Sequence, residues 1–381
     1  MNDKQIPQSK HLFLLVGTNP LPNYVAAKLL LKQDGHIYLV HTNETAQVAD
    51  RLIAALQIEK DNAAKIVVKE AKSDNIFEQI AECANGKQDV GLNYTSGTKT
   101  MAVYAYRAVE KYCPGAVFSY LDARTLCMVV NQSNQPCHSF PVALTLKPTI
   151  EILLGLHGYT LRQTPVTKPF KPEVAQALAK TDCAEWRRWC YQNLHNGPDT
   201  PLRKGKELEG IALPCAIDRQ GASTLKDLAG QWGIGIREVA EWLDGKWLEH
   251  YTLWSLHQIA GNCNIHETAM NIIPKERDFE FDVIAMRGYK LFAISCSTET
   301  RKGKLKLKLF EAYARARQMG GDEARVGLVC CAPKDNPDSK PVAIQREIEE
   351  SWDAAGKVRV FGAEHLPDLS NHLRDWFNSQ P

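Results

Sequence analysis

Short apolar segments alternate with amphipathic segments over residues 1–145. Leu12–Val16 is a continuous apolar run that predicts a strand, Gly17–Asn23 predicts a loop, and Tyr24–Lys32 has the apolar spacing of a helix. Further strands are predicted at His36–Thr42, Lys65–Lys69, Asp89–Asn93, Ala116–Leu121 and Cys127–Val130. The helices predicted between them are Thr45–Ala55, Ser73–Ala84 and Lys99–Cys113. This order is typical of an α/β fold with a doubly wound, mostly parallel sheet.

Two unusual loops follow the first and the fourth predicted strands. They read GTNPLPN at residues 17–23 and NYTSGTK at residues 93–99. In open sheets of this kind, ligands bind outside the carboxyl ends of the strands, at the point where the strand order reverses. With the common order 3-2-1-4-5, strands one and four are neighbours there, so both loops are expected to open onto one crevice. No G-x-G-x-x-G follows the first strand, which argues against a dinucleotide cofactor.

The second loop has the composition of an anion-binding site. Thr95, Ser96, Gly97 and Thr98 lie between a predicted strand and a predicted helix, and Lys99 follows them. Backbone N–H groups and the dipole at a helix N-terminus favour negative charge, and Lys99 adds a cation. The loop is not a Walker A loop, because Thr98 separates Gly97 from Lys99. An ordinary capped turn has the same composition, so phosphate binding and a purely structural turn both remain open at this point.

Residues 146–244 are predicted to form a helical linker. Helical stretches lie within Thr149–Leu161 and Pro172–Leu194, and Thr224–Leu243 resembles a helix-turn-helix. The second helix of this motif carries Glu238 and further acidic residues against a single Arg237, which is the wrong charge for approaching phosphates. The segment therefore favours a packing or linker role, and a ligand-responsive transcription regulator that reads DNA with it is the alternative.

Residues 245–381 have a different order of elements. Trp247–Ala260 predicts a helix, Phe279–Met286 and Lys290–Thr298 predict a hairpin, Leu305–Met319 predicts a second helix and Arg325–Cys331 predicts a buried strand. The remaining predicted elements are a helix at Ile344–Ala354, a strand at Lys357–Phe361 and a last helix at His365–Asn378. Helix, hairpin, helix, strand is the core order of restriction-enzyme-like nucleases.

Hydrolysis of a phosphodiester with a divalent metal needs clustered carboxylates for the cation and a lysine beside the attacking water. A restriction-enzyme-like core supplies a Glu on the helix, an Asp on the first hairpin strand and Glu-x-Lys on the second strand. Glu249 and Asp282 occupy the first two places and are the predicted ligands of Mg²⁺ or Mn²⁺. Ser295 and Ser297 stand where the Glu and the Lys are expected, and neutral hydroxyls replace neither charge.

Glu299 lies two residues beyond Ser297 and is expected on the same face of the strand. Four lysines, at positions 302, 304, 306 and 308, follow it closely. One interpretation is that Glu299 and one of these lysines replace the missing pair. The other is that the catalytic site has been lost and the lysines form a solvated helix face.

Composition restricts the size class, the binding partners and the cellular compartment expected for the protein. The chain has 381 residues, enough for two or three domains, and a net charge of +2, which excludes a broad polyanion-coating surface. Its 11 cysteines include no Cys-x-x-Cys and are typical of reduced thiols in a cytoplasmic protein. Leu12–Val16 is too short for a signal peptide or a membrane span, so no membrane contact is expected.

The chain resembles the CARF-domain nucleases of type III CRISPR systems, which join an N-terminal CARF sensor to a C-terminal PD-(D/E)xK domain. The resemblance rests on GTNPLPNYVAA at 17–27, LNYTSGTKTM at 92–101, GKWLEHY at 245–251, EFDVIAMRGYKLF at 280–292 and KLFEAYARARQMGG at 308–321. It implies a Rossmann-like CARF domain at 1–145, a linker at 146–244 and a restriction-endonuclease-like PD-(D/E)xK domain at 245–381.

The resemblance also implies a function. Members of the family pair as two-fold dimers and bind a cyclic oligoadenylate, usually the tetramer, across the dimer axis; they then cut DNA or RNA with a divalent metal. The positions that match the ligand-binding motifs are Thr18, Asn19, Asn23, Thr95, Ser96, Gly97, Thr98 and Lys99. Because Ser295 and Ser297 depart from Glu-x-Lys, a ligand-responsive, non-enzymatic nucleic-acid-binding regulator is the alternative to a nuclease.

Overall fold

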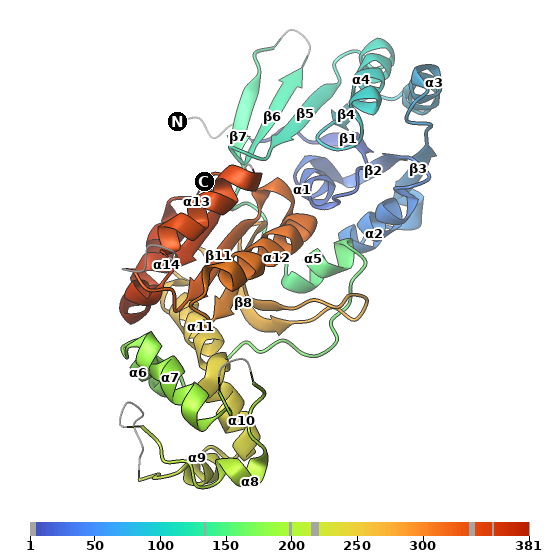
Figure 1. Cartoon of the computed structure of the whole chain (residues 1–381). Helices are drawn as coiled ribbons and strands as arrows, with labels where there is room; N and C mark the ends of the chain where they lie inside the picture. The colour runs from blue at the N-terminus through green and yellow to red at the C-terminus, as the bar shows by residue number, and fades with distance from the viewer. Residues whose placement is uncertain are drawn as a thin grey trace.

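The computed structural model describes residues 5–132, 135–197, 200–214, 221–334, 340–352 and 354–380. Figure 1 shows the N-terminal sheet and its helices at the top, the C-terminal sheet and its helices in the middle, and a group of short helices from the middle of the chain at the bottom. Every helix among the described residues is too short or too polar to span a lipid bilayer.

The N-terminal sheet has seven strands in the order β3-β2-β1-β4-β5-β6-β7. The strands are β1 Ser9–Leu15, β2 Leu31–His41, β3 Ala63–Val67, β4 Val90–Asn93, β5 Val117–Asp122, β6 Cys127–Gln132 and β7 His138–Pro141. Strands β1 to β5 run parallel, and β6 and β7 are added antiparallel at one edge. The predicted order 3-2-1-4-5 is confirmed, whereas β7 was not predicted.

Helices cover both faces of this sheet. They are α1 Leu21–Leu30, α2 Ala46–Leu56, α3 Ser73–Ala84 and α4 Lys99–Tyr112. Alternate residues of β1 serve the two faces: Leu12 and Leu14 pack with α1 and α2, while Phe13 and Leu15 pack with α3 and α4. Helix α1 begins three residues before its predicted start, since Pro22 suits the first turn of a helix, and the chain enters β2 at Leu31.

The C-terminal sheet has five strands in the order β12-β11-β10-β9-β8. Its strands are β8 Ile265–Ile272, β9 Phe281–Arg287, β10 Lys290–Ser297, β11 Arg325–Cys330 and β12 Val358–Phe361. Its helices are α11 Trp247–Ile259, α12 Lys302–Gly320, α13 Pro341–Trp352 and α14 Leu369–Asn378, with the short η3 Gly321–Glu323 and η4 Ala363–Asp368. The hairpin β9–β10 is confirmed. Strand β8 was missed because a register shift between Ile265 and Glu267 breaks its alternation.

The middle of the chain forms short helices. Those after residue 170 share one apolar core with the C-terminal domain, whereas the first, at residues 150–156, packs in the cluster that also contains β1 and α1. The helices are α5 Ile150–Leu156, α6 Pro172–Ala179, α7 Cys183–Asn193, α8 Gly205–Leu208, α9 Leu225–Trp232 and α10 Ile236–Glu241. Helices α9 and α10 form the predicted helix-turn-helix, with Gly233 in the left-handed conformation that ends α9. Helix α10 continues through a turn of π-helix, η2 Trp242–Lys246, into α11, so the boundary proposed after residue 244 lies inside one helical run.

The two sheets are packed against each other through the chain that joins them. One apolar cluster contains β1 and α1 residues together with residues of β9, β10 and α12. The turn at Gly288 fits tightly against the backbone of Ala143, and the N–H of Ile150 donates to the Glu267 carboxylate over 2.8 Å. The N-terminal sheet and the C-terminal sheet are therefore in direct apolar contact.

Candidate functional site

The loops that follow β1 and β4 touch each other. A Cβ atom on Gly17 would lie 3.1 Å from the backbone nitrogen of Gly97 and 3.3 Å from the Ser96 Cβ. Strands β1 and β4 are direct parallel neighbours, with Leu14 opposite Asn93. The prediction that the two loops lie at one edge of the sheet is therefore confirmed.

Three of the predicted ligand-binding side chains hold these loops in place. Asn23 is fully buried, and its Nδ2 donates to the backbone carbonyl at the end of β1 over 2.8 Å. The Thr95 hydroxyl accepts a backbone N–H of β5 at 2.8 Å, and the Thr98 hydroxyl caps the first turn of α4 at 3.2 Å. Asn23 thus lies beneath the crevice rather than in it, and all three residues shape the loops from which other groups point outward.

The groups that remain open to the crevice come from both loops. Thr18, Gly97 and Lys99 are exposed, and Ser96 is half-buried. Gly97 has a φ of 80°, a left-handed conformation that favours glycine. Among the described residues, no acceptor lies within hydrogen-bonding distance of the N–H groups of Gly97, Thr98 or Lys99, which open α4. A helix N-terminus with free donors beside a lysine suits an anion.

Asn19 connects the crevice to the C-terminal domain. Its Oδ1 accepts the N–H of Leu21 at 3.1 Å, which fixes the start of α1. A Cβ atom on Gly321 would collide with the amide of Asn19, so the two residues are in close contact. Gly321 directly follows α12, and Lys308 lies twelve residues before the end of that helix. A ligand that moves the β1–α1 loop would therefore press on α12.

Glu323 is buried beside this contact. Only 3% of its surface is exposed, and its Oε2 lies next to the position that a Gly321 Cβ would take. Burial raises the pKa of the Glu323 carboxyl to about 7, and the neighbouring Asp322 adds to the rise while Arg325 opposes it. The folded protein therefore holds a proton on Glu323 that the unfolded chain releases near pH 4.5.

Replacing Glu323 by glutamine is expected to flatten the pH dependence of stability. In the wild type the free energy of unfolding should fall as the pH rises from about 4.5 to about 7, because only the folded state keeps the proton. Glu323→Gln cannot ionise, so it should be more stable than the wild type at pH 8 by about 1–3 kcal/mol and similar at pH 4.5. Urea melts across this range measure the effect, with Glu350→Gln, at an exposed position of α13, as control. Parallel pH profiles for Glu323→Gln and wild type would contradict the assignment.

A second candidate site lies on the hairpin of the C-terminal sheet. Asp282 on β9 faces Ser295 on β10, and its Oδ2 accepts the Ser295 hydroxyl at 2.9 Å and the Cys296 N–H at 2.7 Å. Asp282 and Ser295 line a cavity of about 220 Å³ that also contains Glu280 and Lys308. The spacing across the hairpin therefore brings the predicted Asp282 and Ser295 together.

Glu249 on α11 completes a cluster of carboxylates. Burial raises the pKa of Glu249 to about 8, and the carboxylates of Asp282 and Glu280 add to the rise. Lys308 and Lys246 act in the opposite direction on the same group. Mutual repulsion among three acids on α11 and β9 marks a place where a cation would be stabilising.

The prediction that Glu299 continues the face of Ser295 and Ser297 is wrong. Strand β10 ends at Ser297, whose hydroxyl accepts the N–H of Glu299 at 3.3 Å. Glu299 is instead bound by Arg301, with Oε2 2.6 Å from a guanidinium nitrogen, and it does not line the Asp282 cavity. Although burial alone would raise it, these hydrogen bonds lower the pKa of Glu299 to about 2. The chain turns there because α12 begins at residue 302.

The lysine of this site is Lys308. Its Nζ donates to the Cys296 carbonyl at 3.3 Å, on the strand that carries Ser295. By contrast, Lys302 and Lys306 are ion-paired with Glu347 on α13, and Lys304 lies 3.6 Å from Glu299. The sequence contained Lys308 among four alternating lysines but could not choose between them. Glu280 was also missed, although its spacing of two from Asp282 was visible.

The residues at the carboxylate cluster provide some, but not all, of the ligands that a divalent cation needs. Mg²⁺ is usually held by one or two carboxylates together with water and substrate phosphates, and Glu249 and Asp282 meet that need. The Oδ1 of Asp282 makes no hydrogen bond with any described residue. No group of three or more His, Cys, Asp or Glu side chains arranged to hold a metal is present in the described ranges. The site therefore suits a cation shared with a substrate rather than a closed structural metal.

The N-terminal part of the chain defines the class of the molecule, an α/β domain whose polar β1–α1 and β4–α4 loops meet at the switch point of its sheet. Residues 12–147 match the family model described as the Card1 CARF domain, so this part of the chain is similar to a CARF domain. A search of curated protein sequences finds no match.

The whole chain is similar in fold to solved structures. Protein VC1899 from Vibrio cholerae matches with a TM-score of 0.65 and 18% identity, over 97% of this chain and 98% of that one. Can2 from Sulfobacillus thermosulfidooxidans, solved with cyclic tetra-adenylate, matches with a TM-score of 0.69 and 18% identity, over 97% and 99%. A type III CRISPR defence DNA nuclease activated by cyclic oligoadenylate matches with a TM-score of 0.50 and 19% identity, over 88% of this chain and 48% of that one. The C-terminal mixed-sheet domain thus shares its fold with the corresponding part of Can2.

Proposed function

We propose that the chain is a homodimeric effector of type III CRISPR defence that acts in the cytoplasm. Its proposed ligand is a cyclic oligoadenylate, specifically cyclic tetra-adenylate. The observation that carries this proposal is the contact between Gly17 and Gly97, which joins two polar loops at the N-terminus of α4. Thr18, Ser96 and Lys99 would contact the phosphates of the ring. The match to the Card1 CARF domain and the likeness to Can2 favour this ligand. A two-fold dimer would present the same loops twice to a ring with two-fold symmetry.

A thermal-shift screen with cyclic tri-, tetra- and hexa-adenylate tests the sensor. Cyclic tetra-adenylate at about 100 times its dissociation constant should stabilise the folded protein by about 2.7 kcal/mol, and linear tetra-adenylate should act less, since its ends are not joined. Equal and small shifts for every ring would refute the sensor.

For the C-terminal domain, the proposal is metal-dependent cleavage of DNA or RNA. Glu249 and Asp282 would hold a divalent cation, which polarises a phosphoryl oxygen and lowers the pKa of bound water. Lys308 would stabilise the charge that develops on the phosphate, in place of the lysine missing at Ser297. Ligand binding would reach this site through the contact between Asn19 and Gly321 and along α12.

A second candidate function is ligand-dependent nucleic-acid binding without cleavage. It is favoured by the Ser295 hydroxyl, which donates to Asp282 where a carboxylate of the Glu-x-Lys motif would stand. Plasmid and single-stranded RNA incubated with protein, Mn²⁺ and cyclic tetra-adenylate separate the two functions. Ring-dependent cuts support the nuclease, whereas intact nucleic acid that is nevertheless retained in a gel shift supports the binding regulator.

A further inference from the structure

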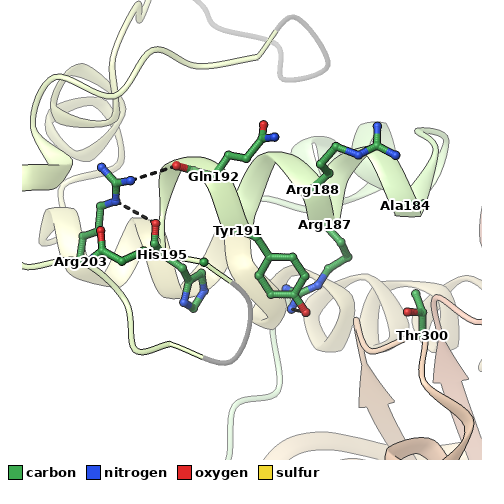
Figure 2. A pocket seen from close by; sticks show the side chains of 10 residues that line it. Ala184, Arg187, Arg188, Tyr191, Gln192, His195, Arg203 and Thr300 are labelled. Atoms are coloured by element: carbon green, nitrogen blue, oxygen red, sulfur yellow. Dashed lines mark hydrogen bonds between the residues drawn. The ribbon is translucent and has the colours of Figure 1, made fainter.

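A basic groove lies outside both sites described above. It has a volume of about 700 Å³ and is lined by α7, the following loop, Arg203 and Thr300 of the C-terminal domain. Three arginines and a histidine line it, and none of the described residues that line it is an aspartate or a glutamate. Figure 2 shows Arg187, Tyr191 and His195 along one side of α7, with Arg203 beyond one end and Thr300 beyond the other. The spacing of four residues keeps Arg187 and Tyr191 on one face of α7, and His195 lies two residues beyond the end of the helix.

Two of the arginines are held rigidly. Arg187 donates to the Asp244 carboxylate and to the Tyr191 hydroxyl, each over 2.8 Å, and its guanidinium lies 4.4 Å from the centre of the Tyr191 ring. Arg203 donates to the carbonyls of His195 and Gln192 over 2.9 and 3.0 Å. An aromatic ring beside fixed guanidinium groups can stack a base while the cations contact its phosphates.

Most of the positive charge in the groove is not neutralised. Asp244 offsets Arg187 and also lies 3.1 Å from Nε2 of His195. Among the described residues, no carboxylate forms an ion pair with Arg203 or with Arg188, which is exposed on the neighbouring row of α7. The whole chain carries a net charge of only +2, so this local excess is not a consequence of general basicity.

The groove is joined to the carboxylate cluster by rigid backbone. Asp244 lies five residues before Glu249 in the continuous run from α10 to α11, about 7 Å along the helix axis. The hydroxyl of Thr298, just beyond β10, donates to the Asp244 carbonyl over 3.1 Å. Thr300, two residues further on, lines the groove itself.

We propose that this groove binds the phosphodiester backbone of a nucleic-acid strand and leads it to the Glu249–Asp282 cluster. The inference rests on the proposed function of the C-terminal domain, for which it supplies a substrate-binding surface. Arg188 and Arg203 contact phosphates, and Tyr191 offers a stacking surface. A groove open along a helix fits a strand better than a single nucleotide, which would need an enclosing pocket for its base.

Fluorescence anisotropy with labelled 20-nucleotide DNA and RNA, in EDTA and with cyclic tetra-adenylate present, tests the groove without cleavage. Arg188→Glu should weaken binding at least tenfold and lower the salt slope of log K by about 0.7 to 0.9 for each phosphate that the variant no longer binds. The matched control is Arg237→Glu on α10, an exposed arginine outside the groove, which should stay within about twofold of wild type. Thermal melts establish that both variants are folded.

Several outcomes would overturn the proposal. Equal affinity of Arg188→Glu and wild type for the strand would show that the groove does not bind it. A larger loss of affinity in Arg237→Glu than in Arg188→Glu would assign strand binding to the helix-turn-helix. Displacement of the strand by millimolar AMP as effectively as by unlabelled strand would assign the groove to a mononucleotide. Binding of the ring is measured separately. If Arg188→Glu binds the strand as tightly as wild type while cyclic tetra-adenylate still binds, the groove proposal is wrong and the sensor proposal stands. If the strand binds in the groove but cyclic tetra-adenylate does not bind, only the sensor proposal is wrong.

Discussion

Asp282→Ala should lower ring-dependent, Mn²⁺-dependent cleavage at least 100-fold while leaving the affinity for cyclic tetra-adenylate unchanged. Asp282 is the only acid in direct contact with Ser295 and the Cys296 N–H among the described residues, and it lies beside Glu249, Glu280 and Lys308. Removing it takes away one of two proposed cation ligands and part of the charge that attracts the cation. Single-turnover cleavage of a labelled duplex measures the change.

The matched control is Ser297→Ala. Ser297 occupies the position where a lysine is expected, but its hydroxyl accepts the Glu299 N–H and it does not line the Asp282 cavity. Its removal should change cleavage by no more than about threefold, since a single neutral hydrogen bond contributes about 1 kcal/mol or less. Equal cleavage by Asp282→Ala and wild type would show that the cutting activity arises elsewhere.

Lys99→Ala should weaken the binding of cyclic tetra-adenylate by about 150-fold or more, because a ring bound across two subunits would lose two phosphate contacts. One charge-assisted hydrogen bond to a phosphate contributes about 1.5–3 kcal/mol, and each subunit of the dimer would lack one. Lys99 is exposed at the first position of α4, where its charge adds to that of the free N–H groups.

Lys111 at the other end of α4 supplies the control for this prediction. It packs over the rings of Phe77 and Tyr112, at the opposite end of the helix from the crevice. Lys111→Ala removes the same charge from the same helix and should leave the dissociation constant within about twofold. Similar decreases in affinity for the two variants would mean that Lys99 acts through net charge alone.

The sequence predicted the crevice because its signal is local and periodic. Buried parallel strands read as apolar runs, and Gly97 and Thr98 stand where a turn and a helix cap need them. What the sequence could not assign was the use of each polar side chain. Asn23 and Thr95 fold back onto the backbone, and a motif does not record whether a hydroxyl faces solvent or a neighbouring strand.

The carboxylate site was predicted less completely for a related reason. The pairing of Asp282 with Ser295 follows from the two-residue hairpin turn, so strand register alone brought them together. Lys308 lies on the next helix, α12. The orientation of its side chain depends on how α12 packs on β10 and β11, and this packing cannot be predicted from residue spacing in the sequence. Strand β10 ends at Ser297, so Glu299 does not continue the strand face that carries Ser295, and the sequence did not indicate this end.

Isothermal titration of the protein with cyclic tetra-adenylate tests the central claim, that the β1–α1 and β4–α4 loops form one binding surface for a ring of phosphates. We expect saturation at one ring for every two chains, with an affinity that falls as salt rises and falls again in Lys99→Ala. Absence of heat at ring concentrations of about 100 µM, together with no protection of these loops from hydrogen exchange, would contradict it.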